Sequence, residues 1–173
     1  MRIGTPDRST VTPDSVIKRE LIDGVNLRHA TVHPDERGEV TEIFSSAWGI
    51  VPEPCAYVYQ TMIRPGKIKG WVYHELQTDR FAVTTGHLKI VLYDPRDGSP
   101  TKGRINEIFL TERTRGLLTI PPYVIHAVQN IGLCDAVWIN MPTVPYNHDR
   151  PDKVRVDAGS GLIPYSFDTG PGW

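Results

Sequence analysis

Residues Gly116 to Asn130 read G-L-L-T-I-P-P-Y-V-I-H-A-V-Q-N and decide the fold. The apolar run stops at Pro121-Pro122, because proline cannot donate the backbone hydrogen bonds of a continuing strand. His126 comes five residues after the first proline, and Asn130 comes four residues after His126. A prolyl turn therefore leads into a second strand, in which His126 points to the inner face. A buried histidine satisfied by a backbone carbonyl is the plainer interpretation of His126.

The rest of the chain is typical of many short strands. Its 173 residues fit one domain, and its 15 glycines and 15 prolines are spread through the sequence. About ten alternating segments predict an antiparallel jelly-roll barrel, with an all-β sandwich of another kind as the alternative. Two of these segments, Phe81 to Thr84 and His87 to Tyr93, are predicted to form a hairpin at Gly86. We expect residues 1–15 to be a flexible arm, residues 16–173 to form the single domain and the C-terminal segment to be irregular.

The charge and the cysteine content limit the kinds of binding partner and the cellular location that we expect for the protein. A net charge of −1, from 19 basic and 20 acidic residues, favours neither nucleic acid nor an anionic membrane as a partner. Cys55 and Cys134 are too few for a disulfide framework, and the polar N-terminus lacks the apolar core of a secretory signal. The expected location is the cytoplasm.

The prolyl turn and its histidine resemble the second short motif of the cupins, P-x-x-x-x-H-x-x-x-N, although Tyr123 stands where that motif usually has glycine. Many cupins bind a metal through an H-x-H pair in the first motif, which is bounded here by Gly66 and Gly86. His74 is present, but Leu76 occupies the position of the second histidine. Glu75 points to the opposite face of a strand from His74, so we predict no metal site.

A metal-free barrel can still remove a proton next to a carbonyl group. A neutral imidazole accepts the proton, and a nearby cation stabilises the enolate. His74 is the candidate base, Arg80 or Lys89 the candidate cation, and His126 a second donor to the oxyanion. The base also needs a carboxylate to orient it, and the residues themselves leave open which one this is.

Several motifs occur in an order similar to that of the dTDP-4-dehydrorhamnose 3,5-epimerase family. They are D-E-R-G-E-V-T-E-I-F (35–44), Gln60, His74, S-P-T-K-G (99–103), I-P-P-Y-V-I-H (120–126), Tyr146 and D-A-G-S-G-L-I (157–163). The resemblance covers about residues 20–165. It implies a cupin-like jelly roll, a homodimer that exchanges N-terminal strands, and a nucleotide-diphospho-4-keto sugar as substrate. It also implies that no metal or organic cofactor is used.

The resemblance assigns roles to individual residues. His74 falls on the catalytic base and Asp157 on its carboxylate partner. Nucleotide and phosphate contacts fall on Arg37, Gln60 and Tyr146, and positions lining the sugar fall on Glu42 and His126. Arg80 replaces a lysine near the sugar O4, which keeps the positive charge.

Two departures from the family pattern affect the expected reaction. Trp71 stands where an arginine normally contacts the diphosphate, so Arg64, Lys67 or Lys69 would have to supply that charge. Asn140 stands where a tyrosine reprotonates the opposite face of the sugar, and an amide is not a useful proton donor. We therefore predict inversion at one centre, or reprotonation through water.

The leading hypothesis is thus an epimerase that acts at C3, C5 or both, in deoxysugar or surface-polysaccharide biosynthesis. A 3,4-ketoisomerase of the same fold would move the keto group instead. A non-catalytic sugar-nucleotide-binding cupin would fit the loss of the tyrosine. A metal-dependent cupin oxygenase is a further alternative.

Overall fold

Two five-stranded antiparallel sheets form the protein. The computed structural model describes residues 9–13 and 17–167. The first sheet has the order β1 (Asn26–His29), β9 (Gly116–Ile120), β6 (Asp79–Thr85), β11 (Ala136–Asn140) and β4 (Tyr59–Ile63). The second has the order β12 (Val154–Arg155), β5 (Ile68–Tyr73), β10 (Ile125–Asn130), β7 (His87–Tyr93) and β8 (Ile105–Thr111). A separate hairpin pairs β2 (Val32–Asp35) with β3 (Gly38–Thr41), and two short 3₁₀ helices are η1 (Ser46–Trp48) and η2 (Ala158–Ser160).

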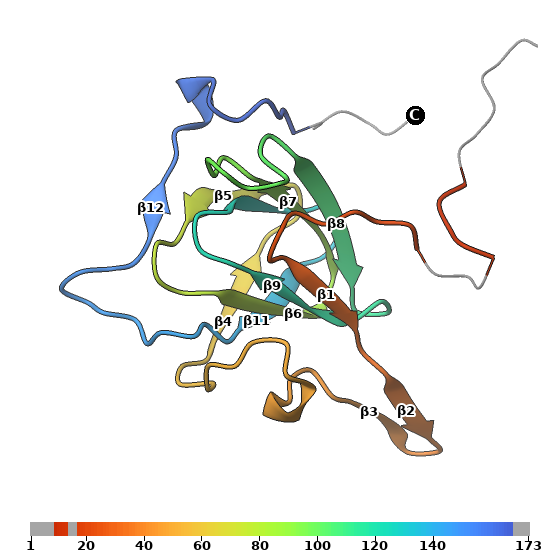
Figure 1. Cartoon of the computed structure of the whole chain (residues 1–173). Coiled ribbons are helices and arrows are strands. Elements are labelled where there is room, and N and C mark those ends of the chain that lie inside the picture. Colours follow the sequence, from red (N-terminus) through yellow and green to blue (C-terminus); the bar gives the residue numbers. More distant parts are fainter. Residues whose placement is uncertain (1–8, 14–16, 168–173) are drawn as a thin grey trace, which may run out of the picture.

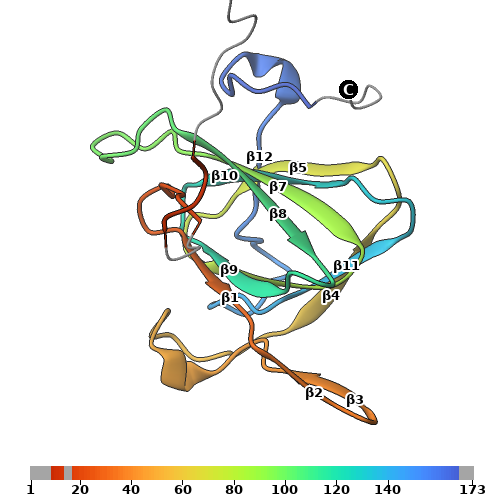
Figure 2. The same ribbon diagram turned by 90° about the vertical axis from the view of Figure 1, so that its right-hand side faces the viewer.

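The two sheets lie as layers with the core between them (Figure 2). On β7, Leu88, Ile90 and Leu92 point into this core and are almost completely buried. The first sheet contributes Phe81, Val83, Leu118 and Trp138 from its inner face. Alternation along each strand thus fills one closed interior, which confirms the predicted cupin-like jelly roll.

The predicted hairpin at Gly86 is wrong. β6 pairs with β9 and β11, whereas β7 pairs with β10 and β8, so the chain passes from one sheet to the other at Gly86. Gly86 has a φ of +78°, and an added Cβ would lie 2.7 Å from the Cβ of Ala136. Only glycine fits this tight crossing, so the predicted turn at Gly86 is confirmed. The predicted pairing of the two strands on either side of it is not.

The C-terminal segment covers the outer face of the second sheet. Trp71 on β5 points outward and packs against Tyr165 and Phe167, with ring centroids 6.0 and 5.4 Å away. Ile163 joins the same apolar cluster. Trp71 therefore lies on the face of β5 opposite the barrel interior.

The hairpin of β2 and β3 projects from the barrel (Figure 1). Val40 on β3 keeps 66% of its surface exposed. The contact with the barrel includes Arg115, which donates to Glu39 and, at 3.0 Å, to Thr41. Most of the predicted arm, residues 1–15, lies outside the described residues. No helix in the described part of the chain is long and apolar enough to cross a membrane.

The S-P-T-K-G motif is part of a hydrogen-bond network around Asp94. This carboxylate is completely buried at the end of β7 and accepts hydrogen bonds from Arg96, Ser99 and Thr101, at 2.8, 2.6 and 2.6 Å. Burial raises its pKa, but these donors outweigh burial and hold the pKa well below the usual range. The motif therefore fixes the loop between β7 and β8.

This network predicts a pH-dependent cost for Asp94→Asn. Because the folded-state pKa is lowered, the ionised carboxylate stabilises the fold above the unfolded pKa of about 4, and this contribution is lost as the pH falls further. We expect the variant to lose about 2–3 kcal/mol at pH 7. In denaturant titrations, the difference from wild type should shrink between about pH 4 and pH 2. A difference independent of pH would contradict this assignment.

Candidate active site

Three buried side chains converge in the barrel interior. His74 follows β5, Asp79 begins β6, and His126 lies on β10. The Oδ2 atom of Asp79 lies 3.4 Å from Nε2 of His74 and 3.3 Å from Nε2 of His126. The two imidazole rings stack with centroids 6.0 Å apart. The site therefore has one carboxylate oxygen between two histidines.

Both histidines are held through their other nitrogen. Nδ1 of His74 contacts the carbonyl oxygen of Asp152, and Nδ1 of His126 lies 3.2 Å from the carbonyl oxygen of Val124. A carbonyl oxygen only accepts hydrogen bonds, so each Nδ1 carries a proton. In the neutral ring Nε2 is then unprotonated, and its lone pair faces the site.

The second oxygen of Asp79 is held by two amides. Oδ1 accepts hydrogen bonds from Nε2 of Gln77 at 2.8 Å and from Nδ2 of Asn140 at 2.9 Å. The amide of Asn140 is oriented by the backbone N–H of Arg80, which donates to Asn140 Oδ1 at 3.1 Å. Its Nδ2 also donates to the hydroxyl of Tyr59 at 2.8 Å. Asn140 thus holds Asp79 in place.

The histidine contacts shift the protonation of the site. Burial raises the pKa of Asp79, but contact with His126 and His74 outweighs burial and lowers the pKa, so Asp79 is a carboxylate at neutral pH. Burial lowers the pKa of His74, yet Asp79 and Asp152 outweigh it and raise the pKa. His74 is therefore a stronger base than a free imidazole.

Asp152 fixes the loop that carries His74. Its carboxylate accepts hydrogen bonds from three successive backbone N–H groups, those of Glu75, Leu76 and Gln77, at 2.9–3.3 Å. Its carbonyl oxygen contacts the ring of His74. The irregular C-terminal segment therefore positions the ring of His74.

Two cavities open next to the histidines. One, of about 430 Å³, is lined by His74, Tyr57, Tyr59, Tyr146 and Lys153 among others. The other, of about 370 Å³, is lined by all three residues of the buried trio together with Tyr59, Lys69, Lys153 and Arg155. Cations therefore border the cavity in which Nε2 of His74 lies, and this arrangement suits an anionic ligand.

Lys153 and Tyr59 are shifted in pKa by these surroundings. Partial desolvation of the ammonium group and the charge of Arg155 lower the pKa of Lys153. Burial and the charge of Asp79 raise the pKa of Tyr59 to about 12. Tyr59 is therefore a protonated hydroxyl group at neutral pH.

The structure does not bring Asp157 to His74. Asp157 is exposed and caps η2, where its Oδ1 accepts a hydrogen bond from the N–H of Gly159 at 2.9 Å. In the described chain, the carboxylates that contact His74 belong to Asp79 and Asp152. The predicted His74–Asp157 pair is wrong for this reason.

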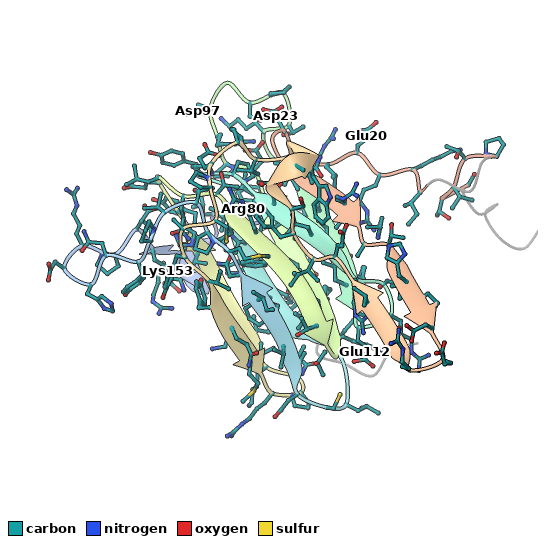
Figure 3. The ribbon with its side chains drawn as sticks, turned by 90° about the horizontal axis from the view of Figure 1, so that it is seen from below. Glu20, Asp23, Arg80, Asp97, Glu112 and Lys153 are labelled. Atoms are coloured by element: carbon teal, nitrogen blue, oxygen red, sulfur yellow. The ribbon has the colours of Figure 1, made fainter. Side chains whose placement is uncertain are left out.

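Arg80 also lies away from His74. It points to the outer face of β6, where its guanidinium donates to the carbonyl oxygens of Glu53 and Pro54 in the segment before β4 (Figure 3). Lys89 lies on the outer face of β7, with Nζ 5.4 Å from the ring centre of Phe167. Neither cation borders the cavities beside His74, whereas Lys153, labelled in the same figure, borders both.

The remaining predicted residues divide into two groups. His126 and Asn140 are buried at the site, and Tyr146 lines a cavity with His74. Gln60 points out of β4 and is exposed, because Tyr59 and Thr61 take the inner face. Arg37 and Glu42 lie exposed on or beside the β2–β3 hairpin, where Arg37 pairs with Asp35 at 2.6 Å. Within one chain, Gln60, Arg37 and Glu42 do not line the cavities beside His74.

Asp79 was missed although the sequence held a signal for it. The strand was predicted to start at Phe81, whereas β6 starts at Asp79. Extending the alternation backwards from Phe81, which faces the core, puts Asp79 on the inner face and Arg80 on the outer face. Nothing comparable marks Asp152 or Lys153, because the segment after Pro142 has no periodic pattern. The sequence also carried no sign that the possible ligand atoms of His74, Asp79 and His126 lie within 4.8 Å of one another.

Comparisons with known proteins identify related sequences. The family model described as dTDP-4-dehydrorhamnose 3,5-epimerase matches residues 19–165. The spore coat polysaccharide biosynthesis protein SpsL of Bacillus subtilis is 33% identical over 149 residues, covering 86% of this chain and 98% of that protein. The probable low-salt glycan biosynthesis epimerase Agl13 of Haloferax volcanii is 32% identical over 136 residues, covering 78% of this chain and 87% of that protein.

The solved structures give the same result. A dTDP sugar isomerase from Desulfovibrio desulfuricans G20 has a TM-score of 0.77 and 29% identity, over 84% of this chain and 91% of that one. The rmlC epimerase of Mycobacterium tuberculosis, at 21% identity and a TM-score of 0.73 over 86% of this chain and 77% of that one, shares the fold. The arrangement of the barrel and the match of the family model over most of the sequence lead to one conclusion: the chain belongs to the dTDP-4-dehydrorhamnose 3,5-epimerase family.

Proposed function

We propose that this isomerase inverts a carbon next to the keto group of a nucleotide-diphospho-4-keto sugar, at C3, C5 or both. The observation that carries the proposal is the position of Nε2 of His74, which lies 3.4 Å from the carboxylate of Asp79 at a cavity bordered by cations, in a ring held by the carbonyl oxygen of Asp152. A base of this kind removes a proton next to a carbonyl group, and a nearby cation stabilises the enolate.

The steps follow from the positions of the side chains. Nε2 of His74 takes the proton from the sugar carbon, and the resulting imidazolium is stabilised by Asp79 at 3.4 Å. Lys153 takes the role expected of Arg80 and neutralises the enolate oxygen, because it lines both cavities beside the base. Lys69 and Arg155 supply the charge for the diphosphate that Trp71 cannot give.

Inversion requires a proton to return to the other face of the sugar. Asn140 is committed to holding Asp79 and cannot donate this proton, so Tyr59 or water supplies it. The hydroxyl of Tyr59 accepts a hydrogen bond from Asn140 and keeps its own proton for the cavity. This arrangement supports reprotonation by Tyr59 or through water.

Arg37 and Glu42 reach a site only in a dimer. The β2–β3 hairpin carries Arg37 with 81% of its side chain exposed, together with the exposed apolar surface of Val40. A homodimer that exchanges N-terminal strands would place this hairpin over the cavity of the second subunit, where Arg37 would contact phosphate.

The relatives named for spore coat polysaccharide and glycan biosynthesis support a role in surface-polysaccharide synthesis. The exposed free thiols of Cys55 and Cys134 support a cytoplasmic location.

Solvent exchange tests the proposed reaction. Incubation with a dTDP-4-keto-6-deoxy sugar in heavy water should place deuterium at C3 or C5, observed by proton NMR. His74→Gln should slow the exchange by about 10³-fold, because the base is lost. Absence of exchange at both carbons in the wild-type protein, with each nucleotide 4-keto sugar tried, would reject the function.

A matched pair of variants tests the carboxylate assignment. Asp79→Asn should slow exchange by about 10²-fold or more, because the imidazolium loses its counter-charge. Asp157→Asn should leave the rate within about twofold, because asparagine is also a good N-cap and Asp157 is exposed. Equal losses in the two variants, at equal thermal stability, would restore Asp157 as the partner.

Mixing two inactive variants tests the shared site. His74→Gln and Arg37→Ala chains, unfolded and refolded together, should regain about a quarter of wild-type sites, because half the dimers are mixed and each has one intact site. Each variant refolded alone is the control. Monomers in sedimentation experiments, or no recovery on mixing, would contradict exchange of the hairpin.

A further inference from the structure

Three atoms converge in the site: Nε2 of His74, Oδ2 of Asp79 and Nε2 of His126. None of them carries a proton when both histidines are neutral. Nε2 of His74 and Nε2 of His126 present lone pairs, because their Nδ1 atoms donate to carbonyl oxygens. Oδ2 of Asp79 is an acceptor as well. All three residues are at least 92% buried, with 8%, 1% and 4% of their surfaces exposed. Three possible ligand atoms within 4.8 Å of one another can bind a cation.

The distances from Asp79 Oδ2 to the two histidine nitrogens fit a metal coordination sphere. The separations of 3.3 and 3.4 Å from Asp79 are longer than a charge-assisted hydrogen bond of about 2.8 Å. Ligand bonds of about 2.0 Å in a tetrahedron put the ligand atoms about 3.3 Å apart. The three ligand atoms lie within 4.8 Å of one another.

We propose that His74 Nε2, Asp79 Oδ2 and His126 Nε2 bind a divalent transition metal ion of the Zn²⁺ or Co²⁺ type. Two imidazoles and one carboxylate are a common ligand set for such ions.

The surrounding contacts are those of a prepared ligand set. The carbonyl oxygens of Asp152 and Val124 orient the two rings, and the amides of Gln77 and Asn140 orient the carboxylate. Such outer contacts fix tautomer and direction in metal sites. The adjoining cavity of about 370 Å³ leaves a fourth position open to a ligand.

The metal and the proposed proton transfer compete for the same lone pair. A metal ion on Nε2 of His74 prevents that atom from accepting a proton, so the loaded protein should be an inhibited epimerase. This consequence rests on the proposed function, whereas metal binding itself does not. The readouts below therefore separate the two.

Titration with Co²⁺ alone tests the site. Metal-free full-length protein should bind one equivalent at micromolar or tighter affinity, give the visible absorption of a nitrogen- and oxygen-coordinated Co²⁺, and lose that absorption to one equivalent of Zn²⁺. Zn²⁺ should also raise the temperature of thermal unfolding. No bound Co²⁺ at about 100 µM metal would overturn the proposal.

Variants assign the ligands. Asp79→Asn and His126→Gln should each weaken Co²⁺ binding at least tenfold, and Gln77→Ala should weaken it by about 10–100-fold through loss of orientation. Asp157→Asn, outside the site, should bind Co²⁺ as wild type does. Circular dichroism of each variant confirms that it is folded. Unchanged Co²⁺ affinity in a folded Asp79→Asn and a folded His126→Gln would overturn the site.

Exchange activity with and without metal then distinguishes the two proposals. Inhibition by Zn²⁺ that a chelator reverses supports both the metal site and His74 as base. Activation by stoichiometric metal supports the metal site and rejects His74 as base.

Discussion

The carboxylate of Asp79 is the group on which the site depends. One of its oxygens lies between two imidazoles and the other between two amides, so a single side chain fixes His74, His126, Gln77 and Asn140. These partners come from the loop between β5 and β6 and from two strands, β10 and β11, which belong to different sheets. A buried charge is tolerated only with such complete compensation. The site therefore forms only when the two sheets have closed into the barrel.

The barrel was predictable from the sequence because each strand carries its own alternation and each turn its own glycine or proline. The face of the sheet on which a side chain lies was harder to predict than the strand itself. Arg80 was assigned to the sugar site as a candidate cation and by the family resemblance, but its side chain contacts the carbonyl oxygens of Glu53 and Pro54 outside the sheet. Since side chains alternate with a period of two, a neighbour along the chain lies on the opposite face. The predicted strand began at Phe81, whereas β6 begins at Asp79, so Asp79 was assigned to no face.

Asn140, where the family resemblance led us to expect a tyrosine, holds Asp79 in place. An amide can receive the backbone N–H of Arg80 and donate to both Asp79 and Tyr59, which a phenol cannot do. The residues after Pro142 could not be placed from the sequence, because an irregular segment has neither period nor register. Asp152 could therefore not be distinguished from Asp157 as the carboxylate that reaches the base.

The tie between Asp152 and His74 spans 78 residues of chain. Closing so long a loop costs entropy. The direction of the imidazole therefore depends on a segment that is distant from it in the sequence. A polypeptide that stopped before Asp152 would lack the carbonyl oxygen that orients the ring of His74.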